Sequence, residues 1–64
     1  MPLKIKETPH QGHTFTWYAE DQEDFCLKII AAYPKGNWKH DWTYDQFVDW
    51  LREDLRDLHI ECIE

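Results

Sequence analysis

Residues 42–47 determine where one helix must begin. Thr43 suits the N-cap position, because its hydroxyl can accept a hydrogen bond from the backbone N–H of Gln46, and Gln46 can return one to the backbone of Thr43. Trp42 before this capping box and Phe47 at the fourth helical position form a hydrophobic staple. Helical spacing then predicts a buried face consisting of Phe47, Val48, Leu51, Leu55 and Leu58, with Trp50 at its border.

An earlier helix is predicted to begin near Glu20 or Asp21 and to end at Tyr33. Asp21 can cap the free N–H groups of the first turn, and Pro34 disfavours helical geometry in the residue before it. The apolar residues at helical spacing predict a buried stripe of Phe25, Cys26, Ile29, Ile30 and Tyr33. Residues 34–37 form the loop between the two helices.

Both ends of the chain alternate between apolar and polar residues, which is typical of strands. The alternating segments are residues 3–7, 13–19 and 59–64, and the cluster at residues 9–12 is a turn between the first two. We therefore predict an α+β fold with the order ββααβ. It has a three-stranded antiparallel sheet with strand order 2-1-3, two helices packed on one face, and a single acidic domain over residues 1–64.

Size and charge exclude several classes of protein. A chain of 64 residues is too short for a multidomain enzyme, a Rossmann unit or a barrel. Thirteen acidic against seven basic residues give a net charge of −6, which disfavours direct nucleic-acid binding. There is no apolar run of about 20 residues, no signal peptide and no catalytic motif, so we expect a cytoplasmic protein without enzymatic activity or cofactor. Cys26 and Cys62 are expected to be reduced thiols.

The most informative pattern is an acidic row on the later predicted helix. Asp45, Asp49, Glu53 and Asp57 lie four residues apart, with Asp54 beside them. Four helical residues advance by about 6 Å, so the carboxylates form one row opposite the leucines. Like charges at this spacing repel each other, although Arg52 and Arg56 can reach two of them. The row is either an ordinary solvated helix face or a surface that binds a basic partner.

A second acidic cluster, at the start of the earlier helix, consists of Glu20, Asp21, Glu23 and Asp24. Helix capping alone can explain it. If both helices cover one face of the sheet, the two acidic groups can share one side of the protein. The lysines would then have to lie on the far face, and these are Lys4, Lys6, Lys28, Lys35 and Lys39.

Two further features have a structural and a functional interpretation. Trp38 either covers the end of the core or is a partly exposed anchor for a protein partner. His10 and His13 could contribute to a metal site, but zinc needs three or four ligands, so we expect surface histidines and no metal.

The length, the charge and the row Asp45-Asp49-Glu53-Asp57 together resemble the small acidic inhibitors that bacteriophages and mobile elements make against host defences, the anti-CRISPR class. The resemblance implies a non-enzymatic DNA mimic, monomeric or dimeric in the bacterial cytoplasm. Its partner would be a protein with a basic nucleic-acid-binding surface, such as a CRISPR effector subunit. The alternative is an adaptor or transcription-modulating module that docks through the aromatic loop around Trp38.

Overall fold

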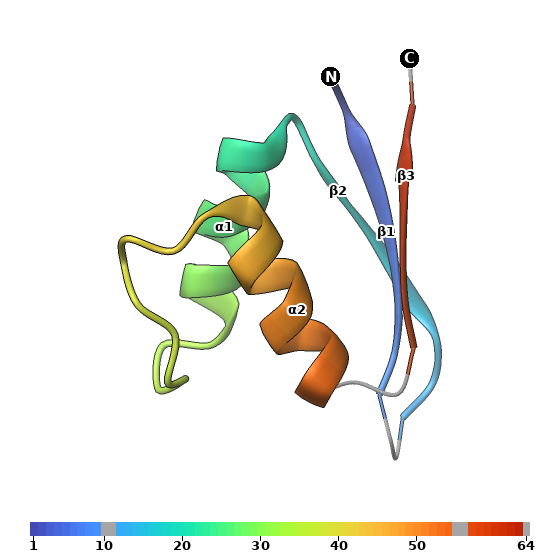
Figure 1. The fold of residues 1–64 in the computed structure, drawn as a ribbon. Helices are drawn as coiled ribbons and strands as arrows, with labels where there is room; N and C mark the ends of the chain where they lie inside the picture. Colours follow the sequence, from blue (N-terminus) through green and yellow to red (C-terminus); the bar gives the residue numbers. More distant parts are fainter. Residues whose placement is uncertain (10–11, 55–56, 64) are drawn as a thin grey trace.

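The computed structural model describes residues 1–9, 12–54 and 57–63. Its elements are β1 (Leu3–Thr8), β2 (Phe15–Ala19), α1 (Gln22–Ala32), α2 (Tyr44–Asp54) and β3 (Asp57–Cys62). β1 is the central strand and pairs antiparallel with both neighbours, in the order β2-β1-β3. The predicted α+β class, the order ββααβ and the strand order 2-1-3 are therefore confirmed (Figure 1).

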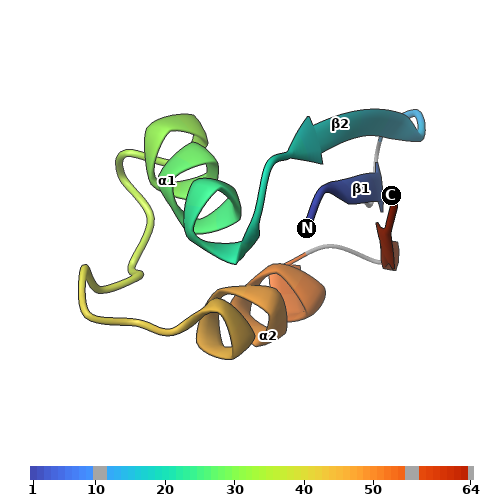
Figure 2. The same ribbon diagram turned by 90° about the horizontal axis from the view of Figure 1, so that it is seen from above.

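The sheet has one covered and one uncovered face. Leu3 and Ile5 of β1 lie opposite Ala19 and Trp17 of β2, and all four side chains belong to the core or pack against it. Both helices lie on this side, whereas no element covers the other side of the described sheet (Figure 2). The buried residues that join the two layers are Leu3, Ile5, Ala19, Phe25, Ile29, Phe47, Val48 and Leu51.

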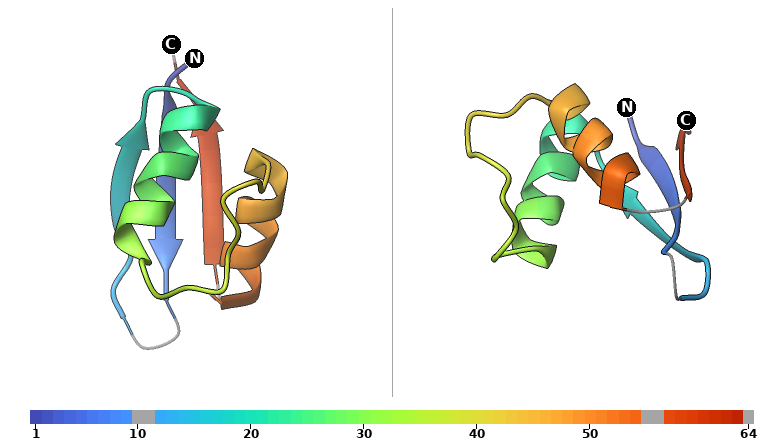
Figure 3. Two further views of the ribbon diagram at one scale, coloured as in Figure 1. Left: turned by 90° about the vertical axis from the view of Figure 1, so that its left-hand side faces the viewer. Right: turned by 60° about the horizontal axis from the view of Figure 1, so that its bottom comes forward.

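The two helices run in the same direction. Their N-terminal ends lie at the end of the molecule where the chain begins and finishes, and residues 33–43 return along the length of α1 to start α2 there (Figures 1 and 3). A parallel pair places two positive helix-dipole ends side by side. Acidic residues near both N-termini offset that repulsion.

The caps at the helix starts form as predicted. Asp21 is the N-cap of α1 and accepts a hydrogen bond of 2.8 Å from the backbone N–H of Asp24. Before α2, the backbone N–H of Thr43 donates to Gln46 Oε1 at 2.8 Å, and the backbone N–H of Gln46 donates to Thr43 Oγ1 at 3.4 Å. Both halves of the predicted capping box are thus present, and the staple rings of residues 42 and 47 lie 5.3 Å apart.

The end of α2 differs from the prediction. The helix finishes at Asp54, and β3 already begins at Asp57, so Asp57 and Leu58 are strand residues and not helical ones. Residues 51, 55 and 58 fit a helical spacing, but residues 58, 60 and 62 fit the alternation of a strand equally well. Pairing decides between the two, because Asp57 lies opposite Thr8 and Leu58 opposite Glu7 along the full length of β1. The predicted helix residues Leu55 and Arg56 and the predicted strand residue Glu64 lie outside the described residues.

Tryptophan side chains attach the loop between the helices to the end of α1 and to α2. Trp38 donates its indole N–H to the carbonyl oxygen of Tyr33, and Trp50 donates its indole N–H to Asn37 Oδ1 at 2.6 Å. The Tyr33 and Trp50 rings meet edge to face, with 5.5 Å between their centroids. Gly36 passes close beneath both indoles, where a Cβ would lie 2.6 Å from Trp38 and 3.0 Å from Trp50. The loop therefore holds the indole of Trp50 in a defined orientation beside the acidic residues of α2.

Candidate partner-binding surface

The acidic residues of α2 are all exposed. They comprise Asp45, Asp49, Glu53 and Asp54, which we call the acidic face of α2. Three of them follow one another at four-residue spacing, as the sequence predicts. Within residues 1–9, 12–54 and 57–63 no lysine, arginine or histidine forms an ion pair with them. The described residues therefore leave the charge of these four carboxylates available to a partner protein.

Asp57 does not belong to this face. It lies at the start of β3 opposite Thr8, on the uncovered side of the sheet. The predicted row of Asp45, Asp49, Glu53 and Asp57 is wrong in its last member, because the chain leaves the helix before residue 57. The acidic face is thus confined to the three turns of α2.

Half-buried tryptophans border the acidic face. Trp42, Gln46, Asp49, Trp50 and Glu53 surround a shallow hollow of about 250 Å³. A neighbouring hollow of about 250 Å³ extends over Trp50 and Glu53 towards Asn37 and Asp54. An arginine guanidinium can stack on an indole while it pairs with a carboxylate, and this surface offers both groups side by side.

Sequence reasoning missed this role of Trp42 and Trp50. It assigned them to the helix staple and to the border of the buried face. The signal was present, because residues 46, 49, 50 and 53 lie at i, i+3, i+4 and i+7 on one side of a helix. Trp50 on that side of the helix marks it as only partly polar, and Trp42 lies just before the helix begins.

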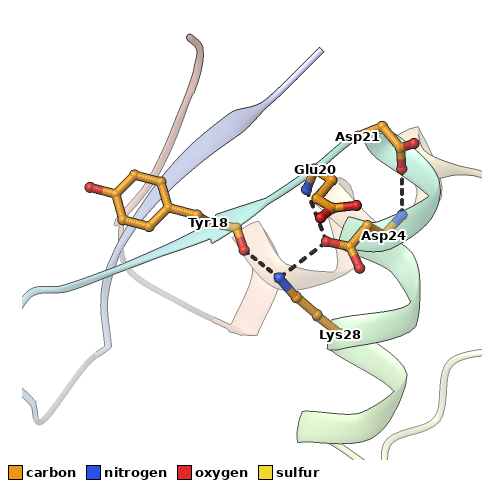
Figure 4. Close-up of polar contacts among 5 residues, drawn as sticks. All are labelled: Tyr18, Glu20, Asp21, Asp24 and Lys28. Carbon is orange, nitrogen blue, oxygen red and sulfur yellow. Dashed lines mark hydrogen bonds and ion pairs between the residues drawn. The ribbon is translucent and has the colours of Figure 1, made fainter. Parts of the chain in front are cut away.

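Part of the acidic group at the start of α1 serves as a helix cap (Figure 4). Asp21 accepts the N–H of Asp24, while Asp24 Oδ2 accepts the backbone N–H of Glu20 at 2.9 Å and pairs with Lys28 Nζ at 3.1 Å. The N–H of Glu20, and then Lys28, lower the pKa of the Asp24 carboxyl. Glu20 and Glu23 remain exposed at the surface. The capping interpretation therefore accounts for two of the four carboxylates.

The two acidic groups begin at the same end of the molecule. Both helices begin at the same end (Figure 3), and Asp45 lies in the first turn of α2 as Glu23 and Asp24 lie in the first turn of α1. The acidic face then continues along α2 towards the opposite end. The charge is therefore extended along one helix rather than gathered in one cluster.

The lysines do not all lie on the far face. Lys4 and Lys6 alternate with the core residues of β1 and point to the uncovered side of the sheet, as expected. Lys28 lies on α1, and Lys35 and Lys39 lie exposed in the loop between the helices. The expectation is wrong for these three, so the helix side carries both signs of charge.

Trp38 is tied to its own chain. It is half-buried, its indole N–H is bonded to Tyr33, and its ring centroid lies 6.3 Å from that of Phe47 and 4.9 Å from that of His40. These contacts are those of a residue that covers the end of the core. The aromatic residues with the largest exposed fractions are instead Phe15 and Tyr18 on β2.

The histidines and cysteines form no recognisable binding site within the described residues. His13 is exposed, and His10 lies outside the described residues. Over the described ranges no group of three or more histidine, cysteine or acidic side chains could hold a metal ion. Cys26 and Cys62 are free thiols. In the same part of the chain, neither helix has the length and apolar character needed to cross a membrane.

Comparisons with protein-family profiles, with curated proteins and with solved structures found no significant match.

Proposed function

We propose that this chain is a non-enzymatic inhibitor that covers a basic, nucleic-acid-binding surface of a host defence protein by presenting the acidic face of α2 in place of DNA. The observation that carries the proposal is the exposure of Asp45, Asp49 and Glu53 at helical spacing. Carboxylates about 6 Å apart along a helix offer a basic groove a charge pattern similar to that of phosphates along a strand.

The charge arrangement favours electrostatic capture of the partner. A net charge of −6 on 64 residues steers a basic surface towards this protein and repels nucleic acid from it. We therefore infer that it binds a protein, such as a CRISPR effector subunit, and does not bind DNA or RNA directly. An inhibitor of this anti-CRISPR kind would act in the bacterial cytoplasm, as a monomer or a dimer.

The tryptophans beside the carboxylates add specificity that charge alone lacks. Trp42 and Trp50 provide flat apolar surface next to Asp49 and Glu53. Arginines of a phosphate-binding groove can stack on these rings while their guanidinium groups pair with the carboxylates. A lysine-rich surface could use the charges but not the rings.

The second candidate function is a protein-interaction module, such as an adaptor or a transcription modulator. The hollow over Trp42 and Trp50 favours it, because aromatic side chains are common at interface hot spots. In that case the carboxylates are a solvated rim, and affinity depends mainly on apolar contact. Salt distinguishes the two candidates, since exposed charges are screened beyond about 8 Å at physiological ionic strength.

The test is affinity capture from a bacterial lysate with three proteins. These are the parent, the charge reversal D49K/E53K, and the control reversal D57K/E61K, which changes the net charge equally on exposed residues of β3. We expect the parent and the control to retain the same nucleic-acid-binding protein and the first variant to lose it. Equal capture by all three proteins would contradict the proposal.

A further inference from the structure

A cavity of about 270 Å³ lies between the sheet and the C-terminal half of α1. It shares no lining residue with the acidic face of α2. Aromatic and aliphatic side chains form most of its wall, and Glu7 and Lys28 are its charged members. The lining residues are Glu7, Phe15, Trp17, Lys28, Ile29, Ala32 and Tyr33. This volume is just below that of typical ligand pockets, which suits one small molecule or one side chain.

Glu7 is the unusual residue of this cavity. It lies on the covered face of β1, between Phe15 and Leu58 of the neighbouring strands, and only 2 % of it is exposed. Its Oε1 atom is buried and has no hydrogen-bond partner in the described structure. A buried carboxyl oxygen without a hydrogen-bond donor is costly to keep, so Oε1 can accept a hydrogen bond from a donor that enters the cavity.

The protein's own cation at the cavity is already engaged. Lys28 Nζ donates to the carbonyl oxygen of Tyr18 at 2.7 Å and pairs with Asp24 at 3.1 Å (Figure 4). Neither of the two ion pairs in the described part of the chain involves Glu7. Among the described residues, the Glu7 carboxyl group therefore has no ion-pair partner.

We propose that the cavity binds an organic ammonium group on a short apolar stem, with the Glu7 carboxylate as its counter-ion. The rings of Phe15, Trp17 and Tyr33 line the same space and can surround the stem, and aromatic faces also attract cations. Trp17 is held in place by stacking on Phe25, with 5.3 Å between the ring centroids. The terminal torsion of a glutamate is soft, so the carboxyl group can turn an oxygen towards a donor in the cavity.

Binding and ionisation of Glu7 are coupled. Burial raises the pKa of Glu7, and a hydrogen bond from the Trp17 side chain opposes that shift. Lys28 of α1 and Tyr33, the C-cap of that helix, are the other titratable groups that line the cavity, and burial raises the pKa of Tyr33. β3 contributes the apolar Leu58 opposite Glu7, and no residue of α2 lines the cavity. A bound ammonium group favours the carboxylate, so a proton leaves to solvent and affinity rises with pH.

The experiment is an NMR titration that follows the indole N–H of Trp17. The probes are butylammonium, 1-butanol as its neutral equivalent, and lysine with both ends capped. The proteins are the parent, Glu7→Gln, the control Glu61→Gln on the exposed part of β3, and Ala32→Leu, which fills the cavity from α1. The titrations of the parent and of Glu7→Gln are repeated from pH 4 to pH 7.

We expect saturable binding of butylammonium to the parent and to Glu61→Gln, about tenfold weaker binding to Glu7→Gln, and none to Ala32→Leu. Affinity should rise with pH in the parent and stay level in Glu7→Gln. If the capped lysine also binds, the natural ammonium group can be a lysine side chain of a partner protein. If the capped lysine does not bind, the natural ligand is a free amine. The proposal is wrong if the parent binds 1-butanol as tightly as butylammonium. It is also wrong if Glu7→Gln binds butylammonium with the same affinity as the parent. Neither result bears on the proposed function of α2.

Discussion

Replacement of Glu7 by leucine should stabilise the protein at neutral pH. Glu7 occupies a position that the alternation of β1 assigns to the core, beside Leu3 and Ile5. Leucine has a comparable volume and no polar atom to satisfy. The buried Oε1, which has no partner among the described residues, disappears with the substitution.

The size and the pH dependence of this effect follow from the burial of Glu7. An unsatisfied buried polar group costs about 1–3 kcal/mol, so the gain at pH 7 should be of that order. For a domain of this size each kcal/mol raises Tm by about 4–8 °C. Because the pKa of Glu7 is raised in the folded state, its neutral form is tolerated at low pH, and parent stability falls as pH rises through that pKa. The gain should therefore be smaller at pH 4 than at pH 7.

Urea unfolding followed by tryptophan fluorescence at both pH values measures the gain. The matched control is Glu61→Leu, the same substitution at an exposed position of β3, which should change stability by no more than about 0.5 kcal/mol. A Glu7→Leu protein that is less stable than the parent at pH 7, or whose gain is equal at pH 4, would refute the reasoning. Either result would mean that both oxygens of the Glu7 carboxyl group have hydrogen-bond partners in solution.

Three further substitutions test the caps and the loop. Thr43→Ala should cost about 1 kcal/mol, seen as a lower urea midpoint, and an unchanged midpoint would show that α2 does not depend on this cap. Gly36→Ala should cost about 1–3 kcal/mol and shift the indole signals of Trp38 and Trp50, because the added Cβ would lie within 3.0 Å of both rings; unchanged spectra would contradict the loop packing. Asp24→Asn should lower the urea midpoint at pH 6 but not at pH 2, because the lowered pKa of Asp24 contributes stability that is lost as pH falls; equal midpoints at pH 6 would exclude this contribution.

The architecture could be predicted because independent local signals agree. The capping box at Thr43 and the cap at Asp21 predicted where the two helices begin, and Pro34 predicted where α1 ends. The alternation of residues 3–7 and 13–19 predicted the first two strands. Strand order followed from the simplest pairing of the last strand with the first. Agreement of this kind across several levels is what a single native fold requires.

The boundary between α2 and β3 could not be predicted from local pattern. Leu58 satisfies a helical period with Leu51 and a strand period with Ile60, and only pairing with β1 selects the strand. The same ambiguity placed Asp57 in the acidic row. The strand forms here because residues 57 and 58 pair with β1, which is far away in the sequence, and no local sequence pattern contains that information.

The two site features that were missed had weaker signals. The alternation Leu3, Ile5, Glu7 already places an acidic residue on the core face, which is a rare position for an unpaired charge. Trp50 appeared as the border of a buried face, and its exposure depends on how the loop at Asn37 holds the indole. Burial of individual atoms depends on tertiary packing and is not contained in periodicity.

The most direct test of the proposed function is competition between this protein and DNA for the captured partner. A short DNA duplex is titrated against a preformed complex with the partner over a range of salt concentrations. The proposal predicts mutually exclusive binding, an affinity that falls steeply as salt rises, and slower association for D49K/E53K with little change in dissociation. Simultaneous binding of DNA and this protein, with a charge-reversed variant that binds as well as the parent, would contradict mimicry by the acidic face of α2.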